Sequence, residues 1–254
     1  MAITLRDVSK SFRVKNSNRY EVLTDINLDV PDGHIVTIFG PNGSGKTTLL
    51  NIIAGVETLD SGTVSVSGAN SNRPQIGYAF QNFRDSLLPW ESSLDNISFS
   101  LRAKGIPRLE ARTQALSFLE KHNLNIPYES YPYQLSIGQQ QLVALARTLI
   151  QYPGNVLLDE PFTALDHEMR FRMQDIAVSV LQSTNTSIIF VSHDVDEAIY
   201  LSDELFLLSK RPAKIVSRFS IPFNRPRHHD LLASVEFAEL RRRVVGAFLD
   251  ELKP

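Results

Sequence analysis

The segment with the clearest chemistry spans residues 40–47, GPNGSGKT, and fits the pattern G-x-x-x-x-G-K-[ST] in full. Glycines allow backbone N–H groups to close around phosphate oxygens, and the positive end of a following helix favours the same charge. Lys46 can reach the β- and γ-phosphates, and the Thr47 hydroxyl can ligate Mg²⁺. We therefore expect a nucleoside triphosphate to bind here with magnesium. The expected contact residues are Gly40, Pro41, Asn42, Gly43, Ser44, Gly45, Lys46, Thr47 and Thr48.

Two acidic residues, Asp159 and Glu160, follow the apolar segment 156–158. Charges seldom end a buried strand unless they face a cation or a reacting centre. In proteins with this phosphate loop an acid at the strand end holds Mg²⁺, mostly through water, and Asp159 takes that role. Glu160 is placed to orient or deprotonate the attacking water. The alternative is an ordinary strand-to-loop transition with solvated acids.

A histidine follows a second apolar segment, residues 187–191, within Ser192-His193-Asp194. Because α/β sheets bind ligands at the carboxyl ends of their strands, His193 is positioned to contact the γ-phosphate from the far edge of the site. The alternative is a structural histidine.

These residues depend on strands that the hydrophobic pattern predicts. Apolar residues alternate or run continuously in short segments separated by turn residues, and the polar segment 15–20 is typical of a hairpin tip. The expected strands are residues 3–8, 22–30, 35–39, 63–67, 156–158 and 187–191, the last two as central parallel strands.

Helices are expected between and after these strands. The phosphate loop leads into a helical pattern that ends at Gly55, and residues 92–150 are mostly helical. Two amphipathic patterns have apolar or long side chains three or four residues apart. One comprises Leu109, Arg112, Leu116 and Leu119 and ends near residues 122–125, and the other comprises Phe237, Leu240, Val244 and Phe248.

The composition excludes several classes of protein. A chain of 254 residues suits one large domain or two small ones, and 43% hydrophobic residues exclude disorder. A formal net charge of -2 argues against binding nucleic acid through bulk positive charge. No apolar run approaches the roughly 18 residues of a membrane span, and the N-terminus lacks a signal-peptide pattern. The absence of cysteine excludes disulfides, thiolate zinc sites and cysteine nucleophiles. From these observations together we expect a soluble, cytoplasmic protein.

Taken together, the motifs resemble those of the ATPase subunit of ABC transporters, in the order that this family has them. After the phosphate loop, Gln81 in Tyr78-Ala79-Phe80-Gln81 is similar to the Q-loop glutamine. The segment Leu135, Ser136, Ile137, Gly138 and Gln139 resembles the signature motif. Asp159-Glu160 follows, then Ala164-Leu165-Asp166 as the D-loop and His193 as the switch histidine.

The resemblance implies a fold and its subdomains. It implies an α/β fold of the P-loop NTPase class, with a RecA-like parallel-sheet core, an N-terminal antiparallel β subdomain and an inserted helical subdomain. Within a single domain over residues 1–254, the core with its β subdomain takes residues 1–90 and 151–222, the helical signature subdomain residues 91–150, and a helical tail residues 223–254.

The resemblance also implies roles for individual residues. Gln81 senses the γ-phosphate and, with Thr47 and Asp159, belongs to the Mg²⁺ site, while Asp166 couples two sites across a dimer. Phe12 resembles the aromatic residue that stacks on adenine, with Tyr20 as a weaker candidate. The alternative for Phe12 is a packed residue of the strand core.

The signature segment has its own mechanics. Ser136 followed by Gln139 is a capping-box pattern that opens the helix over residues 140–150. Such a helix start is an anion site, and in this family it contacts the γ-phosphate bound to the opposite subunit. The family usually has glycine where this chain has Ile137. Isoleucine can donate its N–H equally well at negative φ but is strained at positive φ, and the sequence leaves both possibilities open.

Two segments are similar to one branch of the family, the importers of nitrate, sulfonate, taurine and bicarbonate. They are residues 85–90, with Leu87-Leu88-Pro89-Trp90, and residues 224–227. In this family the Q-loop region forms a groove for a short helix of the membrane subunit, so an exposed Trp90 would mark a binding surface. The alternative is that Leu87, Leu88 and Trp90 pack the helical insert.

Two charged segments have ordinary explanations. The adjacent residues His228 and His229 suit a solvated loop better than a metal site. Residues 241–243, three arginines, suit a solvated helix face better than a lipid anchor.

The leading hypothesis is an ATP-hydrolysing, energy-coupling transporter subunit, a translocase component at the cytoplasmic face of the cell membrane. Its cofactors are ATP and Mg²⁺. Its partners are a second ATPase subunit, identical or different, two permease subunits and, indirectly, a periplasmic or lipid-anchored solute-binding protein, with no nucleic acid. The alternatives are a soluble non-transport ABC ATPase, a heterodimer half with an altered signature site, and a simple phosphoryl-transfer kinase.

Overall fold

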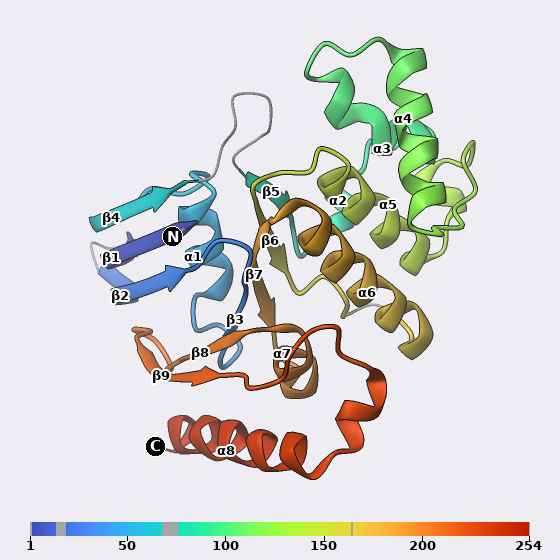
Figure 1. Cartoon of the computed structure of the whole chain (residues 1–254). Coiled ribbons are helices and arrows are strands. Elements are labelled where there is room, and N and C mark those ends of the chain that lie inside the picture. Colours follow the sequence, from blue (N-terminus) through green and yellow to red (C-terminus); the bar gives the residue numbers. More distant parts are fainter. Residues whose placement is uncertain (1, 14–18, 68–75, 164, 254) are drawn as a thin grey trace. The chain divides into compact units, whose positions relative to one another are not determined.

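The computed structural model describes residues 2–13, 19–67, 76–163 and 165–253 (Figure 1). The expected hairpin tip falls largely outside these residues, as does Ala164 of the expected D-loop. The chain is an α/β protein with one mixed and one antiparallel sheet, and it divides into two compact units. Unit 1 comprises Met1–Gly68 and Ser187–Pro254, and unit 2 comprises Ala69–Thr186.

Unit 1 contains the antiparallel sheet, in the strand order β2-β1-β4. These strands are β1 (Ile3–Arg13), β2 (Arg19–Val30) and β4 (Ser61–Val66). Alternate residues of β1, including Ile3 and Leu5, are fully buried, as the two-residue period of a half-buried strand requires.

Unit 1 also contains four strands of the mixed sheet, in the order β7-β3-β8-β9. They are β7 (Ser187–Ser192), β3 (Ile35–Phe39), β8 (Glu204–Leu208) and β9 (Ile215–Ser220). β3 pairs in parallel with β7 and β8, whereas β9 is antiparallel to β8. Every residue of β3 and β7 is buried, which explains their near-continuous apolar runs.

The helices of unit 1 are α1 (Lys46–Ile53), α7 (Val195–Leu201) and α8 (Val235–Leu252), with a short 3₁₀ turn, η2 (His229–Ala233). The closing helix is confirmed: Phe237, Leu240 and Val244 are its buried residues, and the Phe248 ring centroid lies 5.1 Å from that of Phe39.

Unit 2 combines a parallel pair of strands with five α-helices among its described residues. The strands are β5 (Ile76–Ala79) and β6 (Asn155–Asp159). The helices are α2 (Phe83–Ser86), α3 (Ser93–Arg102), α4 (Arg108–Lys121), α5 (Ile137–Leu149) and α6 (His167–Thr184), with a 3₁₀ turn, η1 (Pro132–Gln134), before α5. None of the helices in the described ranges is both long enough and apolar enough to cross a membrane.

The helix expected near residue 109 exists, and of its expected face Leu119 is buried and Leu116 half-buried, but Leu109 was wrong. Leu109 is 81% exposed, and the buried residues of α4 are Ala111, Ala115, Phe118 and Leu119. The cause is an ion-pair cluster, because Arg108 and Arg112 both contact the buried carboxylate of Asp95 on α3. These contacts turn the arginine side of α4 toward α3 and leave Leu109 in solvent.

Candidate active site

The phosphate loop of unit 1 has a backbone that requires glycine. Gly43 and Gly45 have φ of 76° and 107°, in the region that side chains disfavour. A Cβ on Gly45 would also lie 2.7 Å from Cγ1 of Val22. Gly45 is the N-cap of α1, and no side chain caps this helix. The first amides of α1 therefore point into the loop, where an anion can accept their hydrogen bonds.

Lys46 lies at the centre of this loop. Its Nζ donates hydrogen bonds of 2.9 Å to the carbonyl oxygens of Gly40 and Pro41, and the residue is only 6% exposed. The ammonium is thus already held where a β- or γ-phosphate oxygen can accept a hydrogen bond from it. Ser44 is buried, whereas Thr47 is exposed and Thr48 half-buried at the start of α1.

The position of His193 relative to this loop follows from the sheet. Phe39, the last residue of β3, pairs with Ser192, the last residue of β7. Gly40 and His193 therefore leave the same edge of the sheet from neighbouring parallel strands. His193 is exposed at that edge.

In unit 2 the structure brings Gln81 and Glu160 together. Nε2 of Gln81 donates to Oε2 of Glu160 over 3.2 Å. The two residues follow neighbouring strands, since Ala79 of β5 pairs with Leu158 of β6. Glu160 has φ of 49°, a left-handed conformation that is costly for a residue other than glycine and is often found at functional sites.

The last residue of β6, Asp159, is 1% exposed. Its charge reaches Tyr78 on the neighbouring strand: burial raises the pKa of the Tyr78 hydroxyl above its usual value, and the Asp159 carboxylate raises it further. A buried carboxylate at a strand end suits a bound cation.

The residues expected to hold Mg²⁺ offer oxygen donors, which this ion prefers. They are the Thr47 hydroxyl in unit 1 and, in unit 2, the Asp159 carboxylate and the Gln81 side-chain amide. Because Gln81 uses its nitrogen toward Glu160, its amide oxygen remains available as a ligand. These side chains fit the ion chemically. Within the described ranges, no group of three or more histidine, aspartate or glutamate residues forms a metal cluster.

The signature segment forms a capped helix start in unit 2. Ser136 is the N-cap of α5 and accepts from the Gln139 amide, while the Gln139 side chain accepts from the Ser136 amide over 2.9 Å. The predicted capping box is therefore confirmed. Ile137 is the first helical residue, its φ is not positive, and it is 45% exposed. Isoleucine is thus unstrained here, and its N–H points along the helix axis as that of glycine would.

The start of α5 also contacts the loop that follows Glu160. The side-chain amide of Gln141 donates to the carbonyl oxygen of Pro161. A Cβ on Gly138 would lie 3.3 Å from Cδ2 of Leu165, so this glycine permits a close approach. Asp166 is the N-cap of α6 and accepts from the Met169 amide over 2.9 Å. The sequence pattern did not predict the Gln141 contact, because it joins residues 20 positions apart.

Phe12 on β1 is 38% exposed, so the alternative that it packs in the core is wrong. The Lys10 ammonium lies 4.9 Å from the centroid of its ring. Tyr20 is also exposed, but its hydroxyl accepts from Nη1 of Arg211 over 2.9 Å. The Arg211 guanidinium also lies over the Tyr20 ring, 5.3 Å from its centroid, so each of the two rings has a cation over its face.

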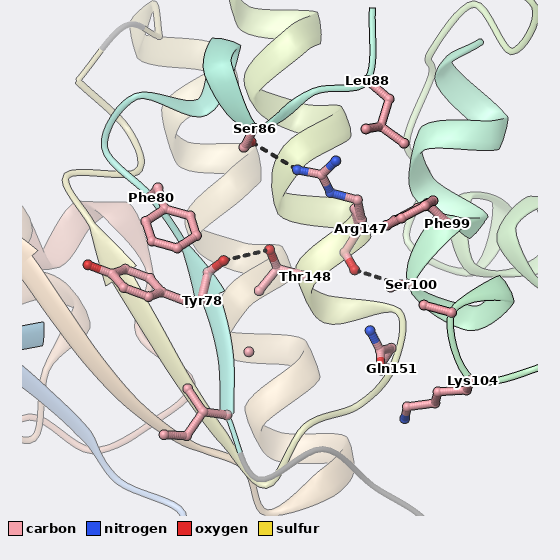
Figure 2. A pocket seen from close by; sticks show the side chains of 13 residues that line it. Tyr78, Phe80, Ser86, Leu88, Phe99, Ser100, Lys104, Arg147, Thr148 and Gln151 are labelled. Atoms are coloured by element: carbon pink, nitrogen blue, oxygen red, sulfur yellow. Dashed lines mark hydrogen bonds between the residues drawn. The ribbon is translucent and has the colours of Figure 1, made fainter. Parts of the chain in front are cut away.

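Unit 2 contains a pocket of about 580 Å³ beside β5, α2, α3 and α5, shown in Figure 2. Phe80 and Phe99 on its walls are 44% and 41% exposed. Arg147, whose pKa is lowered by burial, donates from Nη2 to the Ser86 hydroxyl over 2.9 Å and thereby fixes one wall. The two alternatives for residues 87–90 are each right in part: Leu87 is buried, whereas Trp90 is 71% exposed.

Comparison with known proteins agrees with these features. Residues 23–163 match the protein family described as ABC transporter. An uncharacterised ABC transporter ATP-binding protein of Methanocaldococcus jannaschii is 40% identical over 98% of this chain and 92% of its own length. A taurine import ATP-binding protein of Pseudomonas aeruginosa and an aliphatic sulfonates import ATP-binding protein of Bacillus cereus are each 36% identical. Each match covers 98% of this chain and 96% of the relative.

Among solved structures, a dimeric ATP-binding cassette bound to ADP and Pi matches with a TM-score of 0.77 and 27% identity. It covers 87% of this chain and all of the other. The family match extends over more than half of the chain, and the relatives match it nearly from end to end. The chain therefore belongs to the ABC transporter family and is one of its ATP-binding ATPases.

Proposed function

We propose that this chain hydrolyses MgATP to power an importer of small sulfonate anions of the taurine and alkanesulfonate type. The observation that carries this proposal is the match, over 98% of the chain, to relatives named as taurine and aliphatic sulfonate import proteins. The position of the chain is then the cytoplasmic face of the membrane, held there by its permease partners.

The roles of the residues follow from the phosphate loop of unit 1 and from the residues that follow β5 and β6 in unit 2. Lys46 and the amides at the start of α1 hold the phosphates, and Phe12 stacks on the adenine. Mg²⁺ would be held by Thr47, Gln81 and, through water, Asp159, and would neutralise phosphate charge there. Glu160 accepts a proton from a water molecule whose oxygen attacks the γ-phosphorus, and the bond to the β–γ bridging oxygen breaks to give ADP and Pi. His193 contacts the γ-phosphate.

A second subunit completes the site. The start of α5, with the Ser136 hydroxyl and the amides of Ile137 and Gly138, contacts the γ-phosphate held by the opposite chain. Two features support this: the helix start is capped without strain at Ile137, and a solved relative is dimeric with ADP and Pi. Asp166 couples the two sites, and ATP-driven closure of the dimer moves the membrane subunits.

Hydrolysis is tested by phosphate release from the wild-type chain and from Glu160→Gln, with Mg²⁺ and with excess EDTA. We expect the variant and the EDTA sample to lose turnover while the variant still binds ATP. Near-normal turnover in Glu160→Gln would contradict the assignment of the base. The solute is tested by uptake of labelled taurine, ethanesulfonate and nitrate in host cells that carry either wild type or Glu160→Gln. Loss of nitrate uptake alone would overturn the sulfonate proposal.

The pocket beside Phe80 and Phe99 is the surface that we assign to a short segment of the permease. The chain has no cysteine, so a single introduced thiol reports one position cleanly. Lys104→Cys, on the pocket wall, is expected to cross-link to the permease, whereas Leu249→Cys, exposed on α8, serves as the control. Equal cross-linking of both variants would argue against the pocket.

A further inference from the structure

Two arginines that follow β9 hold the C-terminal end of α7. Nη1 of Arg227 donates to the carbonyl oxygens of Ile199, Tyr200 and Ser202 over 3.2, 2.7 and 2.8 Å. Nη2 of Arg225 donates to the carbonyl oxygen of Leu201 over 2.5 Å. All these groups belong to unit 1. Four consecutive carbonyls at the end of one helix are thus bonded by two guanidinium groups.

This arrangement suits a helix terminus because the last carbonyls have no intrahelical partner and carry partial negative charge. It is also a costly one, because the Arg227 side chain is only 4% exposed. The pKa of Arg227 is lowered to about 10, first by burial and then by the charge of Arg225, while the Asp203 carboxylate opposes the shift. The carboxylate of Asp203 lies 3.2 Å from Arg225. Two largely buried guanidinium groups are more than a seven-residue helix needs to satisfy its last carbonyls, which indicates a further role.

The other end of α7 is joined to His193. The Ser192 hydroxyl donates to Oε2 of Glu197 over 2.5 Å, and the Asp194 amide donates to the Ser192 hydroxyl over 3.0 Å. Oδ1 of Asp194 accepts from the amides of Asp196 and Glu197. Both neighbours of His193 in the chain are therefore bonded to the first turn of α7.

The tail reaches this first turn as well. Nε of Arg241 on α8 lies 2.8 Å from Oδ1 of Asp196. Between the two ends, Ala198 and Ile199 are fully buried, so the short helix is held as a rigid piece. A displacement of its C-terminal end is then transmitted to His193 at its N-terminal end.

We propose that Arg225 and Arg227 are positioning residues for His193, and that the tail thereby sets the rate of ATP hydrolysis without taking part in ATP binding. This inference rests on the proposed contact of His193 with the γ-phosphate. Arg241 supports the same helix from its exposed side and contributes less, since exposed ion pairs are weak.

The test is a double-mutant cycle between Arg227→Lys and His193→Ala, with kcat and KM for ATP measured for each variant. Lysine keeps the charge but has three N–H donors in place of five. It cannot replace Arg227, which bonds the carbonyl oxygen of Phe223 as well as the three carbonyls of α7. We expect Arg227→Lys to lower kcat about tenfold with KM unchanged, because small misplacements of a catalytic group are costly. In the His193→Ala background the same substitution is expected to lower kcat by less than about twofold.

An equal loss of kcat in both backgrounds would overturn the inference, as would a rise in KM of the same size as the loss in kcat. Near-normal kcat in His193→Ala alone would instead contradict the proposed role of the histidine, so the two failures are distinguishable. Should Arg227→Lys fold poorly by its thermal unfolding curve, Arg241→Ala provides the second variant. Arg241→Ala is expected to lower kcat about twofold when His193 is present and to have no effect in the His193→Ala background. Arg242→Ala, exposed on the same helix, is the charge-matched control. Equal effects of these two variants would also overturn the inference.

Discussion

The molecule builds the starts of α1 and α5 by different means. In unit 1, α1 starts at Gly45, with a left-handed backbone, no side-chain cap and Lys46 held inside the loop. In unit 2, α5 starts at Ser136, whose side chain and that of Gln139 bond each other's amides. The first start leaves its amides to the ligand and depends on backbone shape. The second satisfies part of its own amides and depends on a cap.

From this difference we expect one position to tolerate a departure from the family and the other not to. At residue 137 only a helical backbone and an N–H are needed, so isoleucine serves as well as glycine. At residue 45 the backbone itself excludes a side chain. Substitutions in α1 and α5 should therefore differ in kind as well as in size.

The largest effect is expected for Gly45→Ala. The new Cβ would lie 2.7 Å from Val22 and impose positive φ on alanine, so ATP binding should be lost and the free energy of unfolding should fall by about 2–4 kcal/mol. Equilibrium dialysis and urea unfolding measure the two quantities. The control is Gly246→Ala in α8, where a Cβ meets nothing within 4 Å, and which should gain up to about 1 kcal/mol. Retained ATP binding in Gly45→Ala would show that the loop is not backbone-determined.

The next effect separates the cap of α5 from its contact with phosphate. Ser136→Ala and Gln139→Ala each break one half of the capping box and should cost about 1 kcal/mol of stability or less. Under the proposed contact between chains, only Ser136→Ala also removes a hydroxyl that bonds the phosphate of the second chain, so its turnover should fall about 10²-fold. Turnover in Gln139→Ala should stay within about threefold of wild type. Equal losses in both variants would mean that the cap alone matters.

The smallest effects concern residue 137 and sharpen the comparison furthest. Proline is well tolerated at the first helical position but has no N–H, so Ile137→Pro should fold normally and lose about tenfold in turnover. Ile137→Gly keeps the N–H and should stay within about twofold of wild type. Steady-state phosphate release measures both. Should the glycine variant prove much faster than wild type, the isoleucine would be a defect after all.

Much of this could be predicted from the sequence where the determinants are local. Residues 35–39 formed the expected strand without a shift at either end, because a five-residue apolar run bounded by turn residues is too short for a helix. The N-cap at Ser136 was also predicted, since a capping box involves only four neighbouring residues.

What could not be predicted depends on contacts between distant residues. The bond from Gln81 to Glu160 joins residues 79 positions apart, and the left-handed backbone of Glu160 has no signal in its own side chain. His228 and His229 are exposed as expected, although His229 begins η2 and stacks on Tyr200, and the Arg227 side chain beside them is buried against α7. In the sequence, Arg225 and Arg227 show no pattern that distinguishes arginines bonded to a helix end from arginines exposed to solvent.

The central claim is that α5 of one chain completes the ATP site of another. Light scattering of purified Glu160→Gln tests it most directly, because blocked hydrolysis should trap any dimer that ATP holds together. We expect the mass to double on addition of MgATP, and to stay that of one chain when Ser136→Ala is added to the same variant. A Glu160→Gln protein that binds ATP and keeps the mass of a single chain would contradict the claim.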